Sequence, residues 1–314
     1  MKYKITNLKT KEETLVDVRD CRGVAAVVGA DSFVGVRMAE ALASRGRRVL
    51  AFGGSPACPR LAGTADYSGT DYARYDLPPE CRLVLFCHDV SIDRERHLQA
   101  LSALCEHLAA TRSPDAQVRL CYFSSANICN GGSRPISENA AVRPHCLREL
   151  AVCQAEMTLR TWACLSRNAI VPNVFRHGEL YGGAEDSPTN AGHVNECLDL
   201  ARHGRPLEFS GNLNQRRTLV HVEDFAAAVA SLLDRDLIPD LVNVPGERLT
   251  VYDYLSAISE RYGVELTVGM ARRFSENLPL ASCDRVLSAS LFRSEVDFKP
   301  KYKFRPWLKA IHNS

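Results

Sequence analysis

The sequence predicts an α/β fold built on a doubly wound parallel sheet, with a smaller C-terminal lobe. Short, continuous apolar runs alternate with longer amphipathic segments over the first 175 residues. Such runs are typical of strands buried on both faces of a sheet, and the amphipathic segments are typical of the helices that cover it. A glycine-bounded turn joins the first run to the first amphipathic segment. Together these observations indicate β-α-β units and a Rossmann-type domain.

The elements follow in order from residue 24. Residues 24–29 (VAAVVG) form the first apolar run. From Phe33 to Arg45 apolar residues recur every four positions, which predicts a helix that ends near Gly46. Further strands are expected at 49–52, 83–87, 118–123 and 169–174, and further helices at 94–111 and 149–165.

After residue 175 the alternation loosens, and 182–192 is a loop rich in Gly, Asp, Pro and Asn. We expect a Rossmann-like domain at 23–175 and a lobe at 176–314, of which 216–246 returns to the first domain. Residues 1–22 form an N-terminal extension in which KYKIT and ETLVDV suggest a hairpin. The helices expected in the second half are 192–203, 222–234, 251–262 and 305–312, and the strands are 218–221, 241–244 and 265–268.

Composition excludes several classes of protein. The chain of 314 residues carries 39 Lys and Arg against 37 Asp and Glu, and this balance argues against a general nucleic-acid binder. The 12 cysteines show no CxxC spacing and no zinc-type cluster with histidine, so no metal site is expected. Neither a secretory signal nor an apolar run of about 18 residues is found. We expect a cytoplasmic protein with no membrane span and with reduced, mostly buried cysteines.

The turn Gly29-Ala-Asp-Ser-Phe-Val-Gly35 lies where the pyrophosphate of a dinucleotide would contact a helix N-terminus. It resembles the GxxGxxG turn of the extended short-chain dehydrogenases/reductases, the NAD-dependent epimerase/dehydratase family. Gly29 and Gly35 match the outer glycines, and Ser32 replaces the middle one. We expect Ser32 and Asp31 to weaken the anion site, because a carboxylate there repels phosphate unless it turns away. The second strand also ends without the acidic residue that would hold the adenosine ribose.

The resemblance extends over nearly the whole chain after residue 22. Residues 121–126 (CYFSSA) resemble the strand that ends in the catalytic serine, and 176–182 (RHGELYG) resemble an RxxxxYG segment. Residues 215–224 (QRRTLVHVED) resemble the QxRDFVHVxD segment, and 241–251 resemble the late NVGxxxxLTV segment. The resemblance implies an NAD or NADP site at Gly29, Ser32, Phe33, Gly35, Asp76 and Ser124. It also implies a nucleotide-sugar site at Arg217, Arg176, Glu179 and Tyr181, with Arg217 on a phosphate.

The family's chemistry uses Ser, Tyr and Lys, with Tyr and Lys in YxxxK on a helix. The tyrosine is the general acid/base, and the lysine lowers its pKa of about 10. Here Ser125 keeps the serine position, while Leu150 and Gln154 occupy the tyrosine and lysine positions. Residues 140–170 contain no tyrosine and no lysine, so a small shift of register does not restore the motif.

Three functions therefore remain open. The first is an active NAD(P)-dependent epimerase, dehydratase or reductase of nucleotide-sugars. The second is a non-catalytic member, a pseudoenzyme, that binds a nucleotide or nucleotide-sugar. The third is a non-redox enzyme in the same pocket; its candidate groups are Cys129, Cys146, Cys153, His145 and the pair His88-Asp89.

The family usually dimerises through two helices, which correspond here to 94–111 and 149–165. The resemblance thus implies a homodimer, or a heterodimer with a related subunit. Both segments carry apolar residues beyond one stripe, which suggests a buried outer face: Ala100, Ala103, Leu104, Met157, Leu159 and Trp162.

Overall fold

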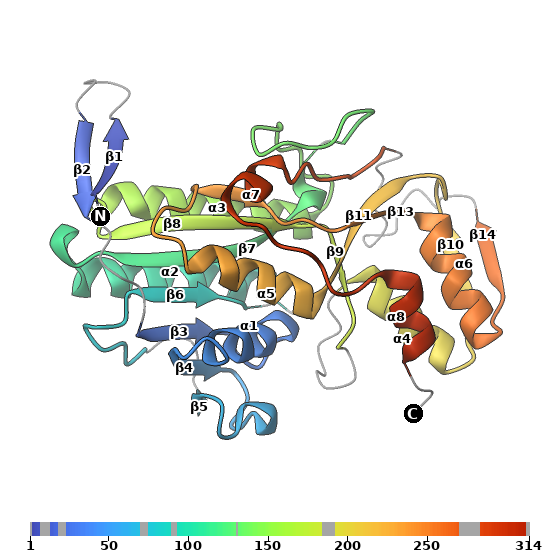
Figure 1. Ribbon diagram of the computed structural model, residues 1–314, viewed down its shortest axis with the longest axis horizontal. Coiled ribbons are helices and arrows are strands. Elements are labelled where there is room, and N and C mark those ends of the chain that lie inside the picture. The colour runs from blue at the N-terminus through green and yellow to red at the C-terminus, as the bar shows by residue number, and fades with distance from the viewer. Residues whose placement is uncertain are drawn as a thin grey trace.

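A parallel sheet forms the centre of the larger domain, and a smaller lobe lies beside it (Figure 1). The computed structural model describes residues 2–6, 13–17, 23–69, 75–88, 93–129, 131–183, 192–269 and 283–311. Within these residues the large sheet has seven strands in the order β5-β4-β3-β6-β7-β8-β12, all parallel. The order reverses at β3, which confirms the doubly wound sheet. The strands are β3 (Val24–Val28), β4 (Arg48–Gly53), β5 (Asp66–Gly69), β6 (Leu83–Phe86), β7 (Val118–Ser125), β8 (Ile170–His177) and β12 (Leu241–Asn243).

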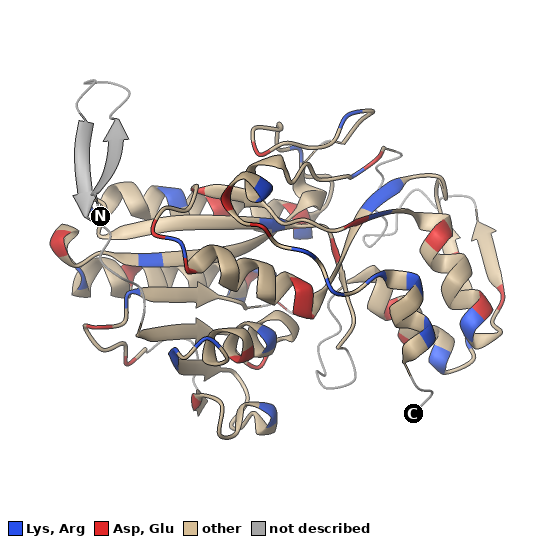
Figure 2. Cartoon of the chain, in the orientation of Figure 1, with Lys and Arg blue, Asp and Glu red and all other residues tan. Residues whose placement is uncertain are grey.

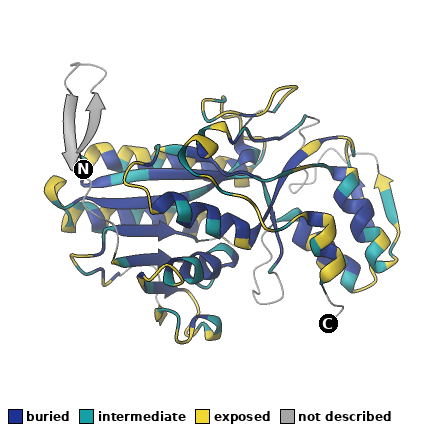
Figure 3. Cartoon of the chain, viewed as in Figure 1, coloured by how far each residue is buried: buried dark blue, intermediate teal, exposed yellow. Residues whose placement is uncertain are grey.

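Helices cover both faces of this sheet because its strands are apolar on both sides. Successive strand residues point to opposite faces, so Val27 packs in one core cluster and Val28 in the other. On one face lie α1 (Phe33–Ala43), α5 (Val222–Leu233) and α7 (Ser290–Glu295). On the other lie α2 (Arg94–Thr111) and α3 (Leu147–Leu165). Figure 3 shows the central strands of the sheet almost wholly buried between them, whereas the edge strand β5 is mostly exposed.

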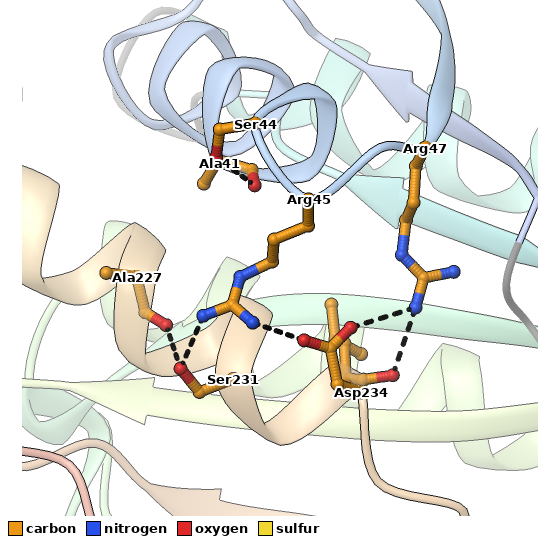
Figure 4. Close-up of polar contacts among 8 residues, drawn as sticks. Ala41, Ser44, Arg45, Arg47, Ala227, Ser231 and Asp234 are labelled. Carbon is orange, nitrogen blue, oxygen red and sulfur yellow. Dashed lines mark hydrogen bonds and ion pairs between the residues drawn. The ribbon is translucent and has the colours of Figure 1, made fainter.

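Polar contacts join the C-terminal ends of α1 and α5 (Figure 4). Arg45 donates to Ser231 Oγ at 2.7 Å and also pairs with Asp234. The buried Arg47 donates to Asp234 Oδ1 at 3.2 Å and to the Leu233 carbonyl at 3.4 Å. The helix that follows the first glycine turn is therefore fixed against α5 by side chains as well as by the core.

The smaller lobe has its own core between helices and two small sheets. Strand β8 leads directly into this lobe, since β9 begins two residues after it. The helices are α4 (His193–Arg202), α6 (Val251–Tyr262) and α8 (Phe304–Ala310). One sheet holds β9 (Glu179–Tyr181), β11 (Arg216–His221) and β13 (Glu247–Thr250), and the other holds β10 (Leu207–Ser210) and β14 (Leu266–Gly269).

The N-terminal extension contains the expected hairpin, in which β1 (Lys2–Thr6) pairs antiparallel with β2 (Glu13–Asp17).

Several other short elements depart from the sequence expectations. Strands β5, β9, β10 and β13 and helix α7 were not predicted, because three to six residues are too few to show a period. Of the segment 216–246, α5 and β12 lie on the large sheet, whereas β11 belongs to the lobe's three-stranded sheet.

The predicted outer face of α2 and α3 is partly wrong. Ala100, Leu104 and Leu159 are 4%, 0% and 0% exposed and pack into the core under these helices. Met157 does point outward and is 67% exposed. No helix in the described part of the chain is long and apolar enough to cross a membrane. Acidic and basic residues are interspersed over both parts of the molecule (Figure 2).

Candidate functional site

Two glycines shape the turn between β3 and α1. Gly29 has a φ of +77°, and a Cβ at this position would lie 2.6 Å from the His88 backbone nitrogen. A Cβ on Gly35 would lie 2.0 Å from the Gly29 carbonyl oxygen. The Gly29 and Ala30 amides donate to the Phe52 carbonyl at 2.8 and 2.9 Å. A side chain at either glycine would therefore break the turn, which lies at the carboxyl ends of β3, β4 and β6.

The two residues expected to obstruct this turn use their side chains within the protein. Ser32 is the N-cap of α1; its Oγ donates to the Cys87 carbonyl at 2.7 Å and accepts from the Gly35 amide at 3.0 Å. Asp31 Oδ2 accepts from the Ser55 amide at 2.8 Å, just beyond β4. This bond holds the Asp31 carboxylate on the β4 side of the turn, not over the first amides of α1. The expected repulsion is reduced accordingly.

The turn consequently fits the pyrophosphate of a dinucleotide. In the first turn of α1 the Gly35 amide is capped by Ser32, whereas the amides of Phe33 and Val34 point out of the helix and can attract an anion. Because Gly29 and Gly35 have no Cβ, the backbone of the turn packs closely against itself and against the segment after β6. Phe33 offers only its backbone, because its ring is buried in the core. Asp76 is exposed at the surface.

Ser124 and Arg176, which the resemblance places at ligands, belong to a buried network. Ser124 Oγ donates to Glu156 Oε1 at 2.6 Å. Arg176 donates two hydrogen bonds to the same carboxylate, from Nε at 3.0 Å and from Nη2 at 2.8 Å. Burial alone would lower the pKa of Arg176, but Glu156 outweighs it and raises that pKa. All three side chains are at least nine-tenths buried, so the network joins β7, α3 and β8 inside the protein.

The residues predicted at the family's catalytic positions lie on β7 and α3. Ser125 is half-buried at the end of β7, and its Oγ accepts from the Asn127 amide at 3.1 Å. Leu150 is 41% exposed in the first turn of α3, and Gln154 is exposed one turn later. His88 is half-buried at the end of β6, while Asp89 lies outside the described residues.

Two buried arginines meet where the lobe joins the large domain. Arg217 and Arg285 form an isolated parallel β-bridge, so their side chains leave the backbone on the same side. They are 4% and 1% exposed. Arg217 Nη2 donates to Gln215 at 2.6 Å, and Arg285 Nη1 contacts Glu149 Oε1 at 3.1 Å. Arg217 Nη1 and Arg285 Nε and Nη2 have no hydrogen-bond acceptor among the described residues.

Other polar groups surround Arg217. Glu179 accepts from Asn127 Nδ2 at 3.3 Å; burial would raise its pKa, but Arg217 and His193 outweigh this and lower it. Tyr254 Oη lies 3.3 Å from His193 Nδ1. Burial lowers the pKa of Arg217, an effect that Glu179 opposes and Arg285 adds to. The arrangement combines two buried arginines with the carboxylates of Glu149 and Glu179, and three guanidinium nitrogens still lack an acceptor among the described residues.

Tyr181, another predicted ligand contact, is a core residue of the lobe. It is 1% exposed, and its ring packs edge-on against Phe304 and Trp307, with centroids 5.1 and 5.0 Å apart. Sequence reasoning missed Arg285, His193 and Tyr254. No motif marks Arg285, because its place beside Arg217 comes from a bridge between segments 68 residues apart, a separation that periodicity does not reveal.

The cysteines near α3 lack the character of activated nucleophiles. Burial raises the pKa of Cys129, and burial together with Glu156 raises that of Cys153 to about 11. Cys146 is the N-cap of α3, where its Sγ accepts from the Glu149 amide at 3.5 Å. Every cysteine that the structure describes has a free thiol. The same residues include no group of three or more His, Cys, Asp or Glu suited to a metal ion.

Comparisons with known proteins agree with this fold. A model of the NAD dependent epimerase/dehydratase family matches residues 25–244. A dTDP-4-dehydro-6-deoxy-D-allose reductase from a Streptomyces species is 26% identical over 142 residues, which make up 44% of this chain and only 42% of that protein. Among solved structures, MoeE5 in complex with UDP-glucuronic acid and NAD has a TM-score of 0.72 and 20% identity, over 91% of this chain and 97% of its own. The UDP-glucose 4-epimerase of Thermotoga maritima with UDP-glucose has a TM-score of 0.73 and 18% identity, over 91% and 96%.

The buried network generates a test of whether Arg176 is structural. Glu156→Gln removes the charge that Arg176 faces, and we expect it to lower the free energy of unfolding by about 3 kcal/mol, because an unpaired guanidinium then remains in the core. Urea denaturation measures this. Asp66→Asn, which breaks the exposed pair with Arg48 at 2.9 Å, should change it by no more than about 1 kcal/mol. Equal effects of the two substitutions would contradict the structural role.

Proposed function

The chain belongs to the NAD dependent epimerase/dehydratase family, and from this we propose that it binds NAD and a nucleotide-sugar without the family's usual acid–base step. It would thus be a binding or regulatory member of the family. The MoeE5 complex, which holds UDP-glucuronic acid and NAD, supports the pairing of these two ligands.

The observation that carries the proposal is the pair Arg217 and Arg285. Two guanidinium groups, almost wholly buried and side by side, have three nitrogen atoms without an acceptor in the described chain. Buried donors are normally satisfied, and each orphan costs about 1–3 kcal/mol. A diphosphate offers acceptors on several oxygens and two negative charges, which suits two guanidinium forks. The diphosphate of a nucleotide-sugar is therefore the ligand proposed here.

The turn at Gly29 and Gly35 supports the dinucleotide. When bound, NAD supplies a nicotinamide that accepts or returns a hydride. The chain's own contribution would be to hold the pyrophosphate on the amides of α1 and to orient the sugar with the Ser125 hydroxyl. Neither contribution moves a proton to or from the reacting oxygen at the rate that a general acid/base provides.

The acid–base pair has no replacement of the same kind in the large domain. Leucine carries no ionisable group and glutamine carries no charge. The lysines are at positions 2, 4, 9, 11, 299, 301, 303 and 309, so residues 12–298 contain none.

One tyrosine does lie beside a lysine, but its environment opposes catalysis. Lys301 Nζ donates to Tyr302 Oη at 3.0 Å, while Tyr302 Oη donates to Glu223 Oε2 at 2.6 Å. The bond to Glu223 raises the pKa of Tyr302, whereas a catalytic tyrosine needs a lowered one. The raised pKa values of Cys129 and Cys153 likewise argue against a thiolate nucleophile in the pocket.

We also propose that the chain forms a homodimer through α3. Leu147, Met157 and Leu165 are 55%, 67% and 67% exposed, and their spacing places them on one side of the helix. Large apolar side chains gathered on one helix face are typical of an interaction surface.

Arg217→Lys tests the anion site. We expect it to weaken binding of UDP-glucose or of a dTDP-sugar by about tenfold or more, because lysine cannot reproduce the guanidinium fork. Isothermal titration calorimetry of each sugar nucleotide measures this. The control is Arg216→Lys, since Arg216 points to the opposite side of β11, where it pairs with Asp284. Equal losses in the two variants, or no binding by the unaltered chain, would contradict the proposed site.

A turnover assay tests the loss of acid–base chemistry. With NAD and UDP- or dTDP-sugars, we expect the unaltered chain to turn over at least about 10²–10⁴-fold more slowly than an enzyme with a general acid/base, because Leu150 and Gln154 cannot exchange a proton with the substrate. Nicotinamide absorbance and product chromatography measure this. The control is Ser125→Ala, which removes the hydroxyl kept at the predicted serine position. Turnover by the unaltered chain that Ser125→Ala abolishes would favour the active enzyme instead.

Light scattering after size-exclusion chromatography tests the dimer. The chain should elute at about twice its monomer mass of 34.7 kDa, and Met157→Glu should shift it to the monomer because a charge is costly at an apolar interface. Tyr252→Glu on α6, at another exposed side chain, should leave the mass unchanged. A monomeric unaltered chain at micromolar concentration would contradict this proposal.

A further inference from the structure

The space beside the last residue of β4 is filled by a carboxylate from another part of the chain. A Cβ built on Gly53 would lie 2.7 Å from the Asp31 carboxyl carbon and 2.2 Å from Tyr67 Oη. Asp31 comes from the turn between β3 and α1, and its Oδ2 is fixed by the Ser55 amide at 2.8 Å. The Asp31 carboxylate therefore occupies the position that a side chain of residue 53 would take.

This position matters because of where a dinucleotide runs. With its pyrophosphate on the start of α1, the adenosine ribose reaches the end of the neighbouring second strand, which here is β4. An acidic residue at that strand end accepts hydrogen bonds from the ribose hydroxyls. The sequence Phe52-Gly53-Gly54-Ser55 contains no acid, and Asp31 brings one to the same place from a different element.

The surroundings hold in place the loop that fixes the carboxylate. Tyr67 Oη donates to the Ser55 carbonyl at 2.8 Å and so holds the loop that fixes Asp31. Burial and the negative charge of Asp31 raise the pKa of Tyr67 to about 12.

We propose that Asp31 is the ribose-binding carboxylate of this chain, and that it makes the chain select NAD over NADP. A carboxylate has about four acceptor sites, so two hydrogen bonds from the ribose hydroxyls of NAD beside the one from the Ser55 amide are within its capacity. The 2′-phosphate of NADP would place two like charges in contact and is rejected. This inference rests on the proposed dinucleotide binding and adds to it the residue and the choice of cofactor.

Calorimetric titration with NAD and with NADP at one salt concentration tests the assignment. The unaltered chain should bind NAD at least about tenfold more tightly than NADP. Asp31→Asn keeps an oxygen for the Ser55 amide but removes the charge, so NAD should weaken by about tenfold and the two affinities should come within a few-fold of each other. Thermal unfolding of the variant checks that the turn remains folded. The control is Asp66→Asn on β5, whose carboxylate pairs with Arg48 at the opposite end of β4.

The outcomes separate this inference from the function on which it rests. Binding of NADP as tightly as NAD, or an unchanged preference in Asp31→Asn, would overturn the role of Asp31 while leaving dinucleotide binding intact. Binding of neither dinucleotide would overturn both. Titration with UDP-glucose on the same proteins reports on the arginine pair independently, and it should be unaffected by Asp31→Asn.

Discussion

One buried carboxylate, Glu156, holds together the part of the molecule on which the site depends. Glu156 lies on α3, and its carboxylate accepts one hydrogen bond from Ser124 of β7 and two from Arg176 of β8. A charge so deeply buried is tolerated only when it is paired and hydrogen-bonded. The three contacts fix how α3 is rotated against the sheet, and hence that Leu150 and Gln154 face outward. They also fix the end of β8, from which the chain crosses into the lobe and carries Glu179 to Arg217.

The two proposed anion sites are built on different principles. At the start of α1 the binding groups are backbone amides. The turn that presents them requires glycine at positions 29 and 35, where a Cβ would clash with the backbone. Beside the lobe the binding groups are two buried guanidinium ions. Burial lowers the pKa of Arg217, and the repulsion from Arg285 adds to this effect. An anion between them would relieve that repulsion. A chain whose net charge is only +2 thus concentrates attraction for a diphosphate at one point rather than over a basic surface.

The sequence was sufficient for the fold, because apolar runs and amphipathic segments report burial directly. Local motifs also marked the glycine turn, whose close backbone packing the structure shows, and Arg217, whose role in binding stays a prediction. The sequence was not sufficient for roles that depend on distant partners. Arg176 and Tyr181 lie in motifs that resemble ligand-binding segments, yet both are buried. Arg176 is hydrogen-bonded to Glu156, and the ring of Tyr181 packs against Phe304 and Trp307. Arg285 had no motif at all, and only its bridge to Arg217 reveals it.

The mutual exclusion between Asp31 and any side chain at residue 53 constrains the order in which this chain can change. Replacing Gly53 by aspartate while Asp31 remains would force two carboxylates into overlapping space and would also displace the Tyr67 hydroxyl. If Asp31 is replaced first, a single further substitution at residue 53 can place an acid at the end of the strand. The two positions are therefore epistatic: the acid can be exchanged between turn and strand only by way of a form that has neither.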